Sequence, residues 1–175
     1  MNHLKAKIVI FLGLLALSAQ LFCAGEKFPE FTAKTLDGGT FTRADFAKHK
    51  VTLLNVWGTF CPPCLEEMPH LGEISREYAD RDFAVVGLVI DTLKENGDLD
   101  EAQVQKAREI VGKTKADYTH MLPATELFPW LGNIQFIPDT VFVDSEGKVI
   151  GKHLIGSASK ADWKAKIEEV LQAVK

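Results

Sequence analysis

Continuous apolar runs alternate along the chain with segments of helical periodicity, which predicts strands separated by helices. The runs 51–56 (VTLLNV) and 83–90 (FAVVGLVI) are almost entirely apolar, so each is expected to be a strand buried on both faces. A helix is predicted between them, over residues 61–78. Two buried strands joined by a helix form a right-handed crossover unit with a parallel strand pair.

Shorter elements are predicted on both sides of this unit. Residues 36–40 (LDGGT) are typical of the turn of a β-hairpin, because glycine adopts positive φ at no steric cost. After the second buried strand we expect a helix at 100–111, a short strand at 118–122, a short helix at 125–131, a strand at 140–143, a turn at 145–147, a strand at 149–154, and a final helix at 159–174.

This order of elements is typical of an α/β fold, in which helices flank a central mixed β-sheet. The predicted hairpin precedes the crossover unit, and an inserted α/β segment separates the second buried strand from Pro138. No linker rich in proline or serine interrupts residues 26–175, so we expect them to form one domain.

The first 25 residues have a different character. Lys5 and Lys7 precede the apolar run 8–22, and no acidic residue occurs before Glu26. This pattern predicts a signal peptide or an N-terminal membrane anchor, although the run is shorter than the roughly 20 apolar residues of a typical membrane span. Cleavage after Gly25, retention as an anchor and lipidation of Cys23 remain open. Each alternative places the domain outside the cytoplasmic membrane.

Composition narrows the classes of function. The chain is 46% hydrophobic and 25% charged, with a formal net charge of −4, and all 24 acidic residues follow residue 25. The acidic body has no basic stripe, which argues against a nucleic-acid partner. We expect a monomer that contacts the membrane only through its N-terminal segment.

The candidate chemistry lies in residues 57–64 (WGTFCPPC), where two cysteines stand two residues apart at a predicted helix start. Unpaired N–H groups and the helix dipole stabilise a thiolate there, so Cys61 is expected to be an exposed nucleophile and Cys64 the buried resolving thiol. A permanent disulfide would close too small a loop to add much stability. A zinc site would need two further ligands, so we expect no metal and no cofactor.

The segment 55–64 (NVWGTFCPPC), followed by Glu67, Pro69 and the pair Ile137-Pro138, resembles the TlpA/ResA-like branch of the thioredoxin superfamily. The resemblance implies a thioredoxin fold, an extracytoplasmic location and thiol–disulfide exchange. It also implies a protein disulfide as substrate, such as an apocytochrome c, a methionine sulfoxide reductase or another envelope protein. A membrane electron donor would then restore the dithiol.

The resemblance makes Pro138 a cis-proline facing the dithiol. A cis-proline leaves the carbonyl and N–H of the preceding residue, Ile137, free to pair with an extended substrate segment. Asp139 stands where the family usually has threonine, so its role beside the substrate groove is open. Trp57 and Phe60 flank the cysteines, and either contact partners or belong to the packing.

Glu67 is the candidate proton partner of the resolving thiol. It lies one turn after Cys64, near the apolar face of the predicted helix, where partial burial would raise its pKa. In thioredoxin a buried aspartate serves this purpose, at the position matched here by Asn55, and an asparagine cannot take up a proton. The alternative is a solvated glutamate on the helix surface.

Two prolines suggest the redox direction. Pro62 and Pro63 lack N–H groups, so the N–H of Cys64 is expected to be the main-chain donor nearest to the Cys61 sulfur. A thiolate with so little stabilisation favours a reductase. One alternative is a peroxiredoxin-like peroxidase, suggested by Thr59 two residues before Cys61. The other is a non-catalytic binding module.

Three histidines and three further aromatic residues are expected to have no role in the reaction. The histidines are expected at the surface and the aromatic residues of the inserted segment in the core. These residues are His49, His120 and His153 in the first group, and Phe128, Trp130 and Phe136 in the second.

Overall fold

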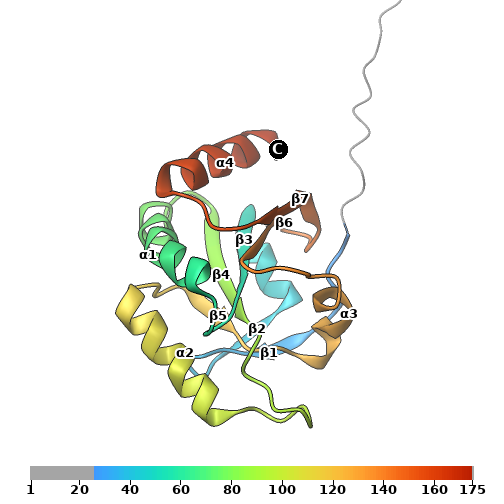
Figure 1. The fold of residues 1–175 in the computed structure, drawn as a ribbon. Helices are drawn as coiled ribbons and strands as arrows, with labels where there is room; N and C mark the ends of the chain where they lie inside the picture. Colours follow the sequence, from blue (N-terminus) through green and yellow to red (C-terminus); the bar gives the residue numbers. More distant parts are fainter. Residues whose placement is uncertain (1–25, 175) are drawn as a thin grey trace, which may run out of the picture.

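A five-stranded mixed sheet forms the centre of the protein (Figure 1). The computed structural model describes residues 26–174, so the expected signal or anchor and Cys23 lie outside the described residues. The strand order is β5-β4-β3-β6-β7, and β1 and β2 form a separate two-stranded sheet. The strands are β1 (Thr32–Lys34), β2 (Thr40–Thr42), β3 (Val51–Trp57), β4 (Phe83–Val89), β5 (Thr119–Met121), β6 (Asp139–Asp144) and β7 (Val149–Ile155).

Strand pairing confirms the predicted crossover unit. β3 pairs in parallel with β4, with Val51 opposite Phe83, and β4 pairs in parallel with β5. β6 runs antiparallel to β3 on the other side and pairs antiparallel with β7. β3 is therefore hydrogen-bonded on both edges, and every one of its residues is buried. Since β3 ends at Trp57, the cysteines follow directly from the most buried strand.

Helical segments connect the strands near the predicted positions. The insertion before Pro138 contains α2, β5, η2 and α3, and the final helix is capped by Ser159, whose side chain accepts from the N–H of Asp162. The helical segments are η1 (Arg43–Lys48), α1 (Pro62–Glu77), α2 (Glu101–Thr114), η2 (Thr125–Leu127), α3 (Phe128–Leu131) and α4 (Lys160–Ala173).

The two faces of the sheet support two apolar clusters. Leu53 and Trp57 of β3 belong to the cluster with α1, α2 and α4, whereas Leu54 and Val56 belong to the cluster with the N-terminal hairpin, η1 and α3. Figure 1 shows α1, α2 and α4 on one side of the sheet. Alternating side chains of one strand thus fill two cores, which explains why β3 is a continuous apolar run.

Between residues 26 and 174, no helix has the length and apolar character needed to cross a membrane.

Close packing of α1 on the end of α2 requires glycine at position 72. A Cβ atom at Gly72 would stand 2.3 Å from the backbone oxygen of Lys115, and a backbone group cannot rotate away as a side chain does. We therefore expect Gly72→Ala to lower the free energy of unfolding by about 1–3 kcal/mol. Urea unfolding of the oxidised protein measures this change.

Gly112 in α2 is a matched control. A Cβ atom there would have no atom within 4 Å, so Gly112→Ala should leave stability unchanged or raise it by about 0.5–1 kcal/mol. Equal effects of the two substitutions would show that the contact with Lys115 does not constrain α1.

Candidate active site

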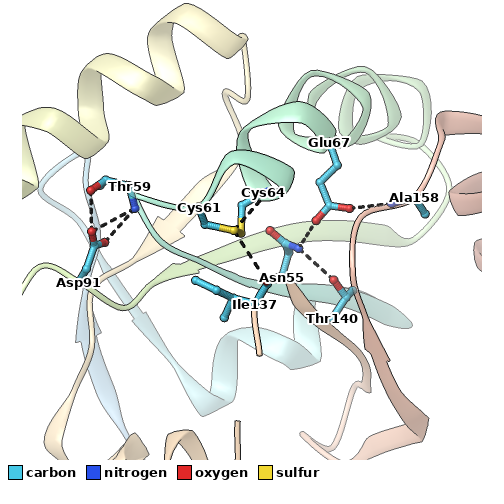
Figure 2. Close-up of a disulfide and its surroundings, with 9 residues drawn as sticks. All are labelled: Asn55, Thr59, Cys61, Cys64, Glu67, Asp91, Ile137, Thr140 and Ala158. Carbon is cyan, nitrogen blue, oxygen red and sulfur yellow. Dashed lines mark hydrogen bonds between the residues drawn. A yellow bond between two sulfur atoms is a disulfide. The ribbon is translucent and has the colours of Figure 1, made fainter. Parts of the chain in front are cut away.

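Cys61 and Cys64 are joined in a disulfide at the start of α1 (Figure 2). Cys61 is the N-cap residue, and its Sγ accepts a hydrogen bond from the N–H of Cys64 at 3.3 Å. Pro62 and Pro63 occupy the first helical positions and have no N–H to offer. The expectation that Cys64 supplies a main-chain donor to the Cys61 sulfur is therefore confirmed.

The expected difference in exposure between the two cysteines is small. Cys64 is fully buried, as predicted, but Cys61 is only 4% exposed rather than open to solvent. The expectation of an exposed Cys61 is wrong for the disulfide form, because its sulfur is bonded to a buried partner and lies against the carbonyl of Ile137.

The peptide bond between Ile137 and Pro138 is cis, as the resemblance implied. The carbonyl oxygen of Ile137 lies 3.7 Å from the Cys61 Sγ. A disulfide sulfur carries no hydrogen, so this approach becomes a hydrogen bond only when Cys61 is a thiol. The cis bond therefore brings the main chain before Pro138 directly to the dithiol, although the two are 76 residues apart.

Phe60 lies at the rim of the site, whereas Trp57 does not. Phe60 is 64% exposed, and together with Ile137 it lines an open groove of about 470 Å³. The other residues of the groove are Ile90, Leu131, Ile134, Gln135 and Phe136. Trp57 is fully buried in the helix-side core, so of its two alternatives the packing role is confirmed and the contact with partners is wrong.

His120 is the hydrogen-bond partner of Trp57, and its expected surface position is also wrong. Its Nδ1 accepts from the indole Nε1 of Trp57 at 3.2 Å, and its Nε2 lies 2.7 Å from the carbonyl oxygen of Ala116. Burial lowers the pKa of His120 to about 4. Gly87 makes the space, since a Cβ atom there would stand 2.3 Å from His120 Nδ1.

Phe136 also contradicts its expected position. Trp130 is in the core as predicted, but Phe128 is 42% and Phe136 is 64% exposed. Phe128 begins α3, whose Trp130 is the residue that packs into the hairpin-side core, and Phe136 lies in the segment between α3 and β6. Phe136 instead joins Phe60 at the groove beside the dithiol.

Asp91 is a site residue that the sequence analysis missed. Both of its carboxylate oxygens accept from the backbone N–H of Thr59 at 3.1 Å, and one also accepts from the Thr59 hydroxyl at 2.5 Å. Figure 2 shows this clamp on the turn that leads to Cys61. Its signal was available, because an aspartate that follows β4 must lie near the end of its parallel neighbour β3.

Glu67 is buried inside the protein, which excludes the alternative of a surface glutamate. It is 1% exposed, and three donors surround its carboxylate: Asn55 Nδ2 at 2.9 Å, Trp163 Nε1 at 3.1 Å and the N–H of Ala158 at 3.2 Å. Burial raises the pKa of Glu67 to about 7, and the three hydrogen bonds oppose this rise. Both protonation states are therefore accessible near neutral pH.

Asn55 connects Glu67 to the sheet. Its Nδ2 donates to Glu67 Oε1 and to Thr140 Oγ1, each at 2.9 Å, and the residue is fully buried. Figure 2 shows its amide next to the disulfide and Glu67. The amide thus occupies the position where thioredoxin has its acidic group, while the acidic group here comes from α1.

Asp139, the residue after the cis-proline, contacts a histidine of the neighbouring strand β7. It is 3% exposed, and the Nδ1 of His153 lies 2.8 and 3.0 Å from its two carboxylate oxygens. Burial raises the pKa of Asp139, and the contact with His153 opposes this change. This contact joins the side chains of β6 and β7 just after Pro138.

In the part of the chain that the structure describes, no group of three or more histidine, cysteine, aspartate or glutamate side chains is placed to hold a metal ion.

Comparisons with known proteins agree with this geometry. The Redoxin family matches residues 23–171. The thioredoxin-like protein YneN of Bacillus subtilis is 29% identical over 154 residues, which cover 82% of this chain and 78% of that protein. The thiol-disulfide oxidoreductase ResA of Bacillus cereus is 24% identical over 146 residues, which cover 83% of this chain and 78% of ResA.

Solved structures show the same fold. A thiol:disulfide interchange protein from Chlorobium tepidum, described as a thioredoxin family protein, superimposes with a TM-score of 0.69 and 26% identity, over 84% of this chain and 97% of that one. The predicted thioredoxin fold is therefore confirmed. The chain belongs to the Redoxin family, as a TlpA/ResA-like member of the thioredoxin superfamily.

Proposed function

We propose that this protein is an extracytoplasmic thiol–disulfide reductase of protein substrates. The observation that carries the proposal is the Cys61–Cys64 disulfide at a helix N-terminus, with the carbonyl of the residue before a cis-proline 3.7 Å from Cys61 Sγ. This arrangement places a redox-active pair beside main-chain groups that can hold an extended polypeptide. The name of ResA as a thiol-disulfide oxidoreductase supports the same reaction.

The reaction transfers two electrons and two protons to the client. The Cys61 thiolate attacks one sulfur of the client disulfide, and the other client sulfur leaves as a thiolate that takes up a proton. Cys64 then loses its proton and attacks Cys61 Sγ, which releases the second client sulfur as a thiol. The product is the Cys61–Cys64 disulfide, and a membrane electron donor returns two electrons, with two protons taken up, to restore the dithiol.

The client segment is expected to lie across Ile137 in an extended conformation. Pairing with the main chain of Ile137 would place the client sulfur at Cys61, while neighbouring client side chains enter the groove beside Phe60. The groove is lined mainly by apolar side chains, which suits a partly unfolded protein. Clients of this kind include an apocytochrome c, a methionine sulfoxide reductase or another envelope protein.

Glu67 is the proposed acceptor of the proton that Cys64 releases. It lies one helical turn after Cys64 with its carboxylate buried, and burial raises its pKa to about 7. A proton acceptor works best when its pKa is near the working pH. Glu67 thus supplies proton uptake inside a region from which water is largely excluded.

Single cysteine variants test the proposed reaction. We expect the reduced protein to reduce insulin disulfides, Cys61→Ser to be inactive, and Cys64→Ser to accumulate mixed disulfides with envelope proteins, because the resolving thiol is missing. Gel analysis under non-reducing conditions detects the mixed disulfides. Rapid peroxide consumption by the reduced protein, with no reduction of insulin, would instead support a peroxiredoxin-like peroxidase, and the absence of both activities would support a binding module.

Substitution of the buried glutamate tests the proton transfer. We expect Glu67→Gln to slow the resolution of the mixed disulfide by about 10²-fold or more at neutral pH, since an amide cannot accept a proton. Stopped-flow measurement across pH provides the rate and its profile. Glu66→Gln is the matched control, because Glu66 is exposed on the same helix turn. Equal rates and equal cysteine titration in wild type and Glu67→Gln would contradict the role.

The free energy of unfolding of the oxidised protein should depend on pH through two buried groups, Glu67 and His120. The pKa of Glu67 is raised to about 7, so its contribution is present below pH 4.5 and is lost as pH rises through 7. The pKa of His120 is lowered to about 4, so its contribution is present above pH 6.5 and is lost as pH falls through 4. Each amounts to about 3 kcal/mol, and they oppose each other between pH 4.5 and 6.5.

In Glu67→Gln, only the contribution of His120 to the pH dependence of the unfolding free energy should remain. We expect the free energy of unfolding of this variant to increase with pH over that window, while wild type changes little. Urea unfolding of the oxidised proteins at several pH values measures the difference. Parallel curves for the two proteins would show that Glu67 has an ordinary pKa.

A further inference from the structure

One polar atom beside the disulfide lacks a partner. The amide oxygen Oδ1 of Asn55 is buried and receives no hydrogen bond from residues 26–174. The Nδ2 of the same amide is fully used, because its two hydrogens go to Glu67 Oε1 and Thr140 Oγ1. A buried carbonyl without a donor is costly, so an acceptor left free at a reactive site needs an explanation.

The direction of this oxygen is fixed by the bonds on the nitrogen. Because both hydrogens of Nδ2 are engaged by Glu67 and Thr140, the oxygen and nitrogen ends of the planar amide are distinguished, and Oδ1 is the end left to meet a further donor. Figure 2 shows the Asn55 oxygen on the side of the Cys61–Cys64 disulfide and the nitrogen on the side of Glu67. Both cysteines are disulfide-bonded, and neither sulfur has a hydrogen to donate in this state.

We propose that Asn55 Oδ1 accepts a hydrogen bond from the thiol of Cys64 when the disulfide is reduced. Reduction adds two electrons and two protons to the sulfur pair and breaks the S–S bond. One of the protons resides on Cys64 Sγ, which then donates to Oδ1. The inference rests on the proposed function only in that the pair must pass through a dithiol state.

This hydrogen bond would make the two thiols unequal. A thiol that donates to a carbonyl keeps its proton, and a thiolate beside the same carbonyl oxygen would be repelled. Cys64 therefore stays protonated in the resting dithiol, while Cys61 accepts the N–H of Cys64 and is free to ionise. Asn55 is a positioning residue, since it acts on the reaction through Cys64.

The same bond couples the dithiol to Glu67. The Nδ2 of Asn55 donates to the Glu67 carboxylate, and a charged acceptor on one side of an amide strengthens hydrogen bonding on the other. Ionised Glu67 thus strengthens the hold on the Cys64 thiol, and protonation of Glu67 weakens it. Thr140 holds the amide from the opposite strand and has no part in the sulfur contact.

A redox equilibrium measures the proposed bond. Asn55→Leu has a similar shape and lacks the acceptor, so we expect its equilibrium with glutathione to shift about tenfold towards the disulfide, or about 30 mV in potential. Thr140→Val is the matched control, because it removes the other partner of Nδ2 and leaves Oδ1 in place. We expect the control to shift less than twofold. An unchanged equilibrium in folded Asn55→Leu would overturn the proposal.

A spectroscopic measurement does not depend on the folding of Asn55→Leu. In full-length protein carrying Cys23→Ser and Cys61→Ser, Cys64 is the single thiol. We expect its infrared S–H band at a lower frequency than that of a free thiol, and Thr140→Val should preserve this shift. A band at the frequency of a free thiol would overturn the proposal. Failure of the wild-type protein to reduce insulin, with the shifted band present in this variant, would contradict the proposed function and leave the hydrogen bond intact.

Discussion

The site depends on the hydrogen bonds that three donors make to the buried carboxylate of Glu67. Its three donors come from β3, from the segment before α4 and from α4 itself, so one side chain of α1 ties the redox helix to both the sheet and the C-terminal helix. Removing Asn55 would leave Glu67 Oε1 buried without a donor, because the other two donors both bond Oε2. The helix start that carries the cysteines is thus held by an interaction whose strength varies with protonation. The Glu67 carboxylate thus both holds α1 in place and is the proposed proton acceptor.

Polar residues form a row across the sheet beneath α1. Thr140 lies opposite Asn55, Asn55 opposite Gly87, and Gly87 opposite His120, so four neighbouring strands place polar or small residues at one level on the helix side. The three polar members are at most 3% exposed. Gly87 provides the space that the His120 ring needs. An apolar core therefore contains a narrow polar layer at the end of the sheet where the dithiol lies.

The sequence predicted the strands and helices well because apolar runs and the cysteine–proline motif are both local patterns. The apolar runs gave β3 and β4, and the spacing of the cysteines together with the two prolines gave the start of α1 and its hydrogen bond. Helical periodicity relative to Cys64 predicted partial burial of Glu67 with a surface position as the alternative, and the structure buries the side chain almost completely. The errors concern exposure. Trp57 and His120 are buried because they pair with each other across two strands, and neither position shows this in the sequence.

The sequence by itself determined the family, the order of elements and the identity of the reactive pair, since these depend on motifs and periodicity within short segments. The tertiary structure alone decided which distant groups meet that pair. The carbonyl of Ile137 lies beside Cys61 and Asp91 clamps Thr59 because strand pairing brings the ends of β3 and β4 and the start of β6 to one edge. The pKa of Glu67 likewise depends on burial by α4, a helix nearly 100 residues away in the chain. Contacts across such separations are set by packing, which no local pattern encodes.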